Sequence, residues 1–127
     1  MKLRIVVAED NAAFLQEFIS ILSAEFEIVA TAANGRAALE HIYRCRPDVA
    51  VLDLQMPLLN GIEVTKELIA NPPAPAIVIC SVETDPEIVE AARQAGALAF
   101  VFKTSMANDL FTAVKSAARG EFFVSRC

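Results

Sequence analysis

One apolar stretch of this sequence ends on a carboxylate. Residues 49–52, Val-Ala-Val-Leu, have the composition of a buried strand, and Asp53 follows them directly. A buried charge without a partner costs several kcal/mol, so a core strand normally avoids such an ending. Asp53 therefore needs nearby groups that neutralise its charge, and its position indicates a chemical role.

Four more polar groups stand at the ends of apolar runs. Glu9 and Asp10 follow the run that ends at Ala8, Ser81 ends another run, and Lys103 follows a third. Three carboxylates at one place repel one another, and the pKa of at least one rises unless a cation intervenes. One lysine cannot balance three acids. Because the cluster offers oxygen ligands without His or Cys, it suits a hard divalent cation, and room for water favours Mg²⁺.

This combination of groups predicts phosphoryl chemistry. A carboxylate at Asp53, beside a metal ion and Lys103, is equipped to attack an electrophilic phosphorus. The metal and the lysine would neutralise the phosphoryl oxygens as charge shifts, and Ser81 would offer a hydroxyl to one of them.

The elements that must position these groups alternate regularly along the chain. Apolar runs predict strands at Leu3–Ala8, Phe26–Ala30, Val49–Asp53, Ala76–Ser81 and Leu98–Phe102. Helical periodicity or start and stop signals predict helices over 14–22, 35–44, 62–70, 85–95 and 106–119, with Phe14, Leu15, Phe18, Ile19 and Leu22 on the apolar face of the first. Strands that are apolar throughout require cover on both faces. We therefore predict one α/β domain, a three-layer doubly wound (βα)5 unit with a parallel five-stranded sheet. In such sheets ligands bind beyond the carboxyl ends of the strands.

Composition narrows the class of protein. The 127 residues are 55% hydrophobic and 21% charged, as expected of a single globular domain. Apolar runs fall far short of the roughly 20 residues that span a bilayer, and the N-terminus reads as a strand instead of a signal peptide. With a net charge of −5 and no Lys/Arg cluster, we expect no direct nucleic-acid contact by this domain. Cys45, Cys80 and Cys127 lack metal-ligand spacing and are interpreted as reduced thiols of a cytoplasmic protein.

Four segments in order, VVAEDN, VLDLQMPLLNG, VICSVE and GALAFVFKTS, resemble the receiver domain of bacterial two-component response regulators. The resemblance covers essentially the whole chain, and each motif falls at the end of the expected strand. It implies a flavodoxin-like fold with strand order 2-1-3-4-5. It further implies that Asp53 accepts a phosphoryl group from the phosphohistidine of a sensor histidine kinase or a phosphotransfer protein.

The resemblance also implies the ligands of the metal. Asp10 and Asp53 would bind Mg²⁺ directly and Glu9 through water, while the backbone carbonyl of Gln55 would complete the protein ligands. Lys103 would pair with the phosphoryl group and the site carboxylates. Such a receiver phosphorylates itself and slowly loses the phosphoryl group, and it is not a turnover enzyme.

Ser81 and Phe100 match the family's switch residues. Phosphoryl oxygens would draw Ser81 inward, and Phe100 would turn into the space behind it, remodelling the face made by the fourth helix, fifth strand and fifth helix. Two departures stand out. Val82 is bulkier than the usual residue after the switch hydroxyl, which would slow access to the site, and Thr104 replaces a proline after Lys103.

The segment LFTAVKSAARGEFFVS is similar to the end of receivers in NarL/LuxR-type regulators, which continue through a linker into a DNA-binding domain. We expect residues 1–121 to form the receiver and 122–127 to begin a linker or tail, which either folds back on the domain or offers a linker or dimer surface. A fragment of a transcription regulator is favoured over a stand-alone receiver, and a homodimer formed on phosphorylation is a further candidate partner.

Three other functions compete with this interpretation. A degenerate receiver would act as an interaction module without phosphorylation. A haloacid-dehalogenase-like phosphatase would need Asp-x-Asp, whereas this chain has Asp53-Leu54-Gln55. A flavin-binding module would need a Gly- and hydroxyl-rich loop where residues 9–10 are acidic.

Overall fold

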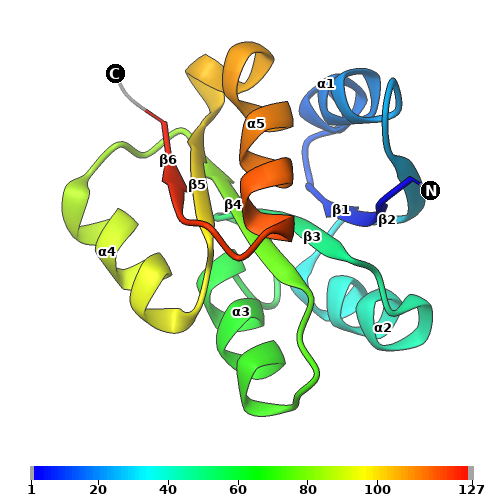
Figure 1. Cartoon of the computed structure of the whole chain (residues 1–127). Coiled ribbons are helices and arrows are strands. Elements are labelled where there is room, and N and C mark those ends of the chain that lie inside the picture. Colours follow the sequence, from blue (N-terminus) through cyan, green and yellow to red (C-terminus); the bar gives the residue numbers. More distant parts are fainter. Residues whose placement is uncertain (1, 126–127) are drawn as a thin grey trace.

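A six-stranded parallel sheet runs through the centre of the molecule in the computed structural model, which describes residues 2–125 (Figure 1). The strands are β1 (Arg4–Ala8), β2 (Glu27–Ala32), β3 (Val49–Asp53), β4 (Ala76–Ser81), β5 (Ala99–Phe102) and β6 (Phe123–Val124). They lie in the order β2-β1-β3-β4-β5-β6, and all neighbouring pairs are parallel. The expected order 2-1-3-4-5 is confirmed, and β6 adds a strand that the sequence did not predict.

Five α-helices alternate with the strands, and a short 3-10 turn precedes the last of them. They are α1 (Ala12–Leu22), α2 (Gly35–Cys45), α3 (Gly61–Ala70), α4 (Pro86–Ala95), η1 (Lys103–Ser105) and α5 (Met106–Ala118). The first three begin after Asn11, Asn34 and Asn60, and the side chain of each accepts a hydrogen bond from a backbone N–H of the first turn. Asp85 does the same for α4.

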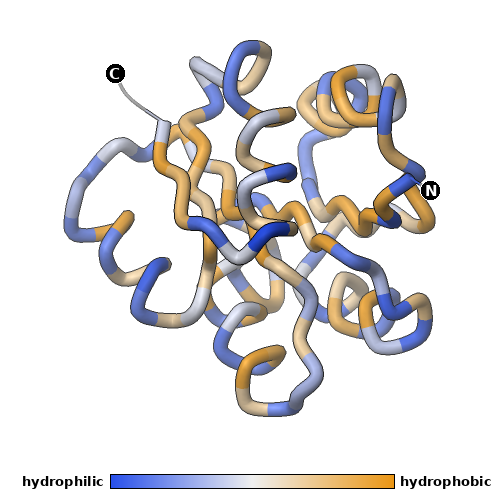
Figure 2. The backbone as a smooth tube through the Cα atoms, viewed as in Figure 1, coloured by the Kyte–Doolittle hydropathy of each residue, from blue (hydrophilic) through white to orange (hydrophobic). Residues whose placement is uncertain are grey.

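The sheet is buried on both faces, as its uninterrupted apolar strands require. Alternate residues along β1 point to opposite sides, so that Ile5 and Val7 pack on the side of α1 and α5, while Val6 and Ala8 pack on the side of α2, α3 and α4. Figure 2 shows hydrophobic residues along the central strands and hydrophilic segments on the outer helices and loops. The predicted three-layer arrangement is confirmed.

The end of the chain folds back onto the sheet. Phe123 and Val124 pair with β5, and the backbone N–H of Ser125 donates to the carbonyl of Phe100 at 2.9 Å. The Oγ of Ser125, which is buried, accepts from the backbone N–H of Phe102 at 3.1 Å. This segment therefore covers the outer edge of β5 between α4 and α5 (Figure 1).

Two of the three cysteines lie within the described residues. Cys45 is half-buried and Cys80 is buried, and both are free thiols, while Cys127 lies outside the described part. Among residues 2–125, none of the helices is long and apolar enough to cross a membrane.

Candidate functional site

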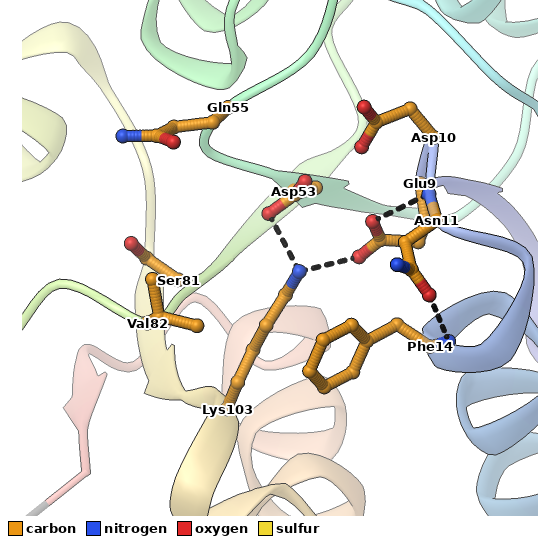
Figure 3. A pocket seen from close by; sticks show the side chains of 9 residues that line it. All are labelled: Glu9, Asp10, Asn11, Phe14, Asp53, Gln55, Ser81, Val82 and Lys103. Carbon is orange, nitrogen blue, oxygen red and sulfur yellow. Dashed lines mark hydrogen bonds and ion pairs between the residues drawn. The ribbon is translucent and has the colours of Figure 1, made fainter.

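The carboxyl ends of four strands meet in one pocket of about 280 Å³. Glu9 and Asp10 follow β1, Asp53 ends β3, Ser81 ends β4, and Lys103 follows β5. β1 and β3 are neighbours at the point where the strand order reverses, which is where open α/β sheets bind ligands. The pocket is lined by Glu9, Asp10, Asn11, Phe14, Asp53, Gln55, Ser81, Val82 and Lys103 (Figure 3).

Three carboxylates converge in this pocket. One oxygen each of Glu9, Asp10 and Asp53 lies within 4.8 Å of the other two. Glu9 and Asp53 are buried, while Asp10 is exposed at the mouth. Carboxylate oxygens at this spacing, with an open side toward solvent, fit a hard cation that keeps part of its water shell. The residues present are thus an acidic cluster typical of a receiver's Mg²⁺ site.

A single ammonium group compensates part of this charge. Nζ of Lys103 lies 2.7 Å from Oε1 of Glu9 and 3.1 Å from Oδ1 of Asp53. The side chains of Lys103, Glu9 and Asp53 are 7%, 0% and 6% exposed, so water screens these contacts little. With Asp10 included, the negative charges exceed the positive by two, the amount that one divalent cation balances.

The environment shifts the pKa of both Asp53 and Lys103. Burial raises the pKa of Asp53 from its ordinary value of 3.8 to about 6, and the Glu9 carboxylate raises it as well, against the opposing effect of Lys103. Burial alone would lower the pKa of Lys103, but its hydrogen bonds to Glu9 and Asp53 outweigh burial and raise it. The lysine is therefore charged at neutral pH. A cation bound beside Asp53 would stabilise the ionised form of its side chain.

Close backbone packing fixes the position of Asp53. The N–H of Leu54 donates to the carbonyl of Cys80 at 2.8 Å, and the N–H of Gly61 donates to the carbonyl of Leu54 at 2.8 Å. A Cβ at Gly61 would lie 2.6 Å from the carbonyl oxygen of Asp53, closer than real contacts allow. The glycine eight residues after Asp53 is therefore required for the loop to close over the end of β3.

Glu9 is held through its backbone and through both oxygens of its carboxylate. Its backbone N–H donates to the carbonyl of Ala32 at 2.9 Å, and its Oε2 accepts from the N–H of Asn11 at 3.0 Å. Asn11 in turn accepts from the N–H of Phe14 at 3.0 Å and begins α1. Because Oε2 is bound to the backbone, Oε1 points to Lys103 (Figure 3).

The remaining wall is made by residues after β3 and β4. Ser81 is buried, and its Oγ accepts a hydrogen bond from the N–H of Glu83 at 2.8 Å, which leaves its own O–H free to donate. Val82, beside it, is 60% exposed at the rim. Gln55 is exposed and also lines the pocket, and Asp53 lies between these residues and the two acids that follow β1 (Figure 3).

Phe100 does not line the pocket. Its ring is 1% exposed and meets the ring of Phe102 edge to face, with centroids 5.9 Å apart. The ring therefore belongs to the core on the side of α2, α3 and α4. Its role as a switch stays a prediction.

Two residues that line the pocket, Asn11 and Phe14, were not predicted as site residues from the sequence. The ring of Phe14 lies over Lys103, with its centroid 4.1 Å from Nζ, although helical periodicity assigned this residue only to the apolar face of its helix. The available signal was its position three residues after Asn11, in the first turn of a helix that begins at the carboxyl end of β1.

Comparison with known proteins gives consistent results. The model of the response regulator receiver domain family matches residues 5–115. The chain is 40% identical over 109 residues to the protein-glutamate methylesterase/protein-glutamine glutaminase of Geobacillus kaustophilus, which covers 83% of this chain and 31% of that protein. It is 33% identical over 125 residues to the transcriptional regulatory protein DegU of Brevibacillus brevis. This match covers 97% of this chain and 53% of DegU.

Solved structures agree with the fold. The signal receiver domain of NarL from Mycobacterium tuberculosis superposes with a TM-score of 0.90 at 34% identity, covering 94% of this chain and 98% of that chain. This chain spans about a third to a half of the length of the two curated relatives, so the match concerns their receiver portion. The chain belongs to the response regulator receiver domain family.

Proposed function

We propose that this chain is a phosphorylation-activated switch in which Asp53 accepts a phosphoryl group from a histidine kinase or a phosphotransfer protein. The observation that supports it most is the meeting of Glu9, Asp10 and Asp53 around the Lys103 ammonium at the switch in strand order. No single residue of this set indicates the function, but together they would supply a nucleophile, a cation site and a fixed positive charge in one pocket.

Asp53 is the nucleophile in this proposal. With a pKa of about 6, its side chain is ionised at neutral pH and burial limits its solvation. Its carboxylate oxygen attacks the phosphorus, the P–N bond of the phosphohistidine breaks, and the electron pair stays on the imidazole nitrogen.

The other pocket residues stabilise the charge that moves. Asp10, Asp53 and the carbonyl of Gln55 would hold Mg²⁺ directly and Glu9 would hold it through water; when bound, the ion neutralises phosphoryl oxygens. Lys103 supplies a second positive charge, and the free O–H of Ser81 donates to a phosphoryl oxygen.

The proposed output is a change of the face formed by α4, β5 and α5. Ser81 ends β4, and Phe100 lies one strand away, where Ile79 and Phe100 are register partners. A shift of the Ser81 hydroxyl toward the phosphoryl group would change packing against Phe100 and remodel this face for a partner. The chain would act in the cytoplasm, and phosphorylation would favour a homodimer through the remodelled surface.

The regulated process is proposed to be transcription. DegU is named a transcriptional regulatory protein, and this chain matches its receiver portion over nearly all of its own length. DNA binding would come from a further domain and not from this one, whose sequence carries no basic cluster. The activity in the name of the methylesterase relative belongs to a region outside the match.

Labelling with acetyl phosphate tests the proposed acceptor. Incubation with Mg²⁺ is expected to add the mass of one phosphoryl group, and chelation of the metal is expected to prevent it. Asp53→Asn should abolish labelling. Asp85→Asn is the matched control, because Asn caps a helix as well as Asp and the residue lies outside the pocket. Labelling that survives Asp53→Asn, or wild-type protein that stays unlabelled, would overturn the proposal and favour an interaction module that works without phosphorylation.

A further inference from the structure

We infer that Phe14 is a positioning residue whose ring holds the Lys103 ammonium in place for phosphoryl transfer to Asp53. This inference rests on the proposed function of Asp53 and extends it to a residue of α1 that carries no polar side-chain group. Phe14 would act through Lys103 and would not touch the phosphoryl group itself.

The contact has the geometry of a cation–π interaction. Nζ of Lys103 lies 4.1 Å from the centroid of the Phe14 ring, well within the roughly 6 Å over which the face of an aromatic ring attracts a cation. The ammonium has three N–H groups, and Glu9 and Asp53 lie within 3.1 Å of it. The ring thus supplies a third partner to a side chain that is only 7% exposed.

The start of α1, which carries the Phe14 ring, is tied to the same carboxylate that binds the lysine. Glu9 accepts from the N–H of Asn11 through Oε2, and Asn11 accepts from the N–H of Phe14. The Phe14 ring faces the Lys103 ammonium, and this ammonium contacts Oε1 of Glu9. These four contacts form a closed circuit, visible on the right of the pocket in Figure 3. We expect a displacement of any member of this circuit to shift the Lys103 ammonium.

Core packing alone does not account for an aromatic residue here. Phe14, Phe18 and Leu22 lie in one row of α1 at intervals of four residues. Phe18 and Leu22 have no exposed surface, but Phe14 is only half-buried and extends beyond the core into the pocket. A leucine would serve the buried part of this position, whereas only a ring presents a π face to the ammonium.

A fixed ammonium matters because phosphoryl transfer moves negative charge. A lysine side chain is long and loses much rotational freedom when it is confined. Where a ring, Glu9 and Asp53 confine it beforehand, less of that loss falls on the transition state. When the Asp53–phosphoryl bond forms and acetate leaves from acetyl phosphate, the ammonium is already beside the phosphoryl oxygens.

The test compares Phe14→Leu with Phe14→Tyr. We expect the initial rate of labelling by acetyl phosphate at saturating Mg²⁺ to fall by about threefold to tenfold in the leucine variant and to stay near wild type in the tyrosine variant. Phe111→Leu is the matched control, because the Phe111 ring also faces a lysine, Lys115 at 5.1 Å, but lies on α5 outside the pocket. If Phe14→Leu does not fold, Phe14→Met removes the ring while keeping a flexible apolar side chain.

A second measurement reads the contact without phosphorylation. In the wild type, the Phe14 ring current should shift the NMR signals of the Lys103 ε-methylene protons upfield. This shift should persist in Phe14→Tyr and disappear in Phe14→Leu or Phe14→Met. Wild-type protein that is never labelled but shows this shift defeats the proposed function and leaves the contact supported. Labelled wild type with an unshifted lysine, or a leucine variant as fast as wild type, overturns the role of Phe14.

Discussion

Nζ of Lys103 lies 2.7 Å from Oε1 of Glu9, a carboxylate whose side chain has no exposed surface. Without Lys103, Oε1 of Glu9 could not be solvated by bulk water, because the side chain is buried. The other oxygen, Oε2, already accepts from the N–H of Asn11. Asp53 shares the same ammonium at 3.1 Å. In the absence of a metal ion, one lysine therefore compensates two buried acids, and the stability of the domain depends on the charge state of the pocket.

Removing the lysine should destabilise the metal-free domain. Lys103→Met leaves two buried carboxylates without a cation, and loss of one partner of a buried ion pair costs about 3 kcal/mol. Urea denaturation at pH 7.5 should show this loss, and Mg²⁺ should restore part of it. Lys66→Met, an exposed lysine of α3, should change little. Equal stability of the two variants would contradict the role assigned to Lys103.

The pKa of Asp53 predicts a pH dependence of stability. Because this pKa is raised from 3.8 to about 6, the folded chain binds the Asp53 proton more tightly than the unfolded chain does. The resulting stabilisation is fully present below about pH 4 and is lost as the pH rises through about 6. Asp53→Asn cannot titrate, so denaturation of the metal-free variant should lack this contribution.

The measurement for this prediction is the free energy of unfolding of metal-free wild type and metal-free Asp53→Asn, each at pH 4 and at pH 8. The wild type should lose stability relative to the variant between the two pH values. A difference between the two proteins that stays constant would contradict the raised pKa.

Magnesium affinity should depend on the same group. A protonated Asp53 cannot serve as a metal ligand, so the dissociation constant for Mg²⁺ should rise as the pH falls below about 6. Isothermal titration calorimetry between pH 5 and pH 8 measures this change. Affinity that is level across that range would mean that Asp53 does not contribute to the metal site.

Val82 should limit the access of phosphoryl donors. Its side chain is 60% exposed at the rim beside Ser81 and lines the pocket. Val82→Ala should raise the rate of labelling by acetyl phosphate by about threefold. The effect is small because the substitution removes only two methyl groups from the rim of the pocket, which lowers the activation barrier slightly. Val89→Ala on α4, away from the pocket, is the control. A rate that is unchanged in Val82→Ala would show that access is not limiting.

Ser125 should stabilise the domain from the end of the chain. Its Oγ accepts from the buried N–H of Phe102, and alanine would leave that N–H without a partner. Ser125→Ala should therefore lower the free energy of unfolding by about 1–3 kcal/mol. Ser20→Ala, at an exposed site on α1, provides the comparison in thermal or urea denaturation. Loss of the same size in both variants would contradict the importance of this hydrogen bond.

The sequence predicted most of the residues that line the pocket, because strand ends are easy to recognise. Asp53, Ser81 and Lys103 each stand at the end of an apolar run, and parallel strands bring such ends to one edge of a sheet. Strand order came from the resemblance and not from the pattern of residues. The ring of Phe14 was overlooked because helical periodicity does not distinguish a core residue from one that extends past the core.

Short or adaptable features were harder to predict. β6 contains two residues, too few for an alternating pattern, and its place in the sheet depends on pairing with β5. The strand expected at Phe26–Ala30 runs over Glu27–Ala32 because its partner β1 continues the pairing to Ala32. For Phe100, its place in an apolar run predicts burial but does not distinguish a switch residue from a plain core residue.

The two residues of β6 also block an edge of the sheet at which another copy of this chain could pair. An uncovered outer strand offers a row of free N–H and C=O groups on which another chain can add, the route by which many sheets polymerise. Here Phe123 and Val124 occupy that row along Ala99 and Phe100. A version of this protein shortened for crystallisation or NMR should keep residues 121–125. Without them the edge of β5 would be unpaired, and we would expect the shorter version to associate through it.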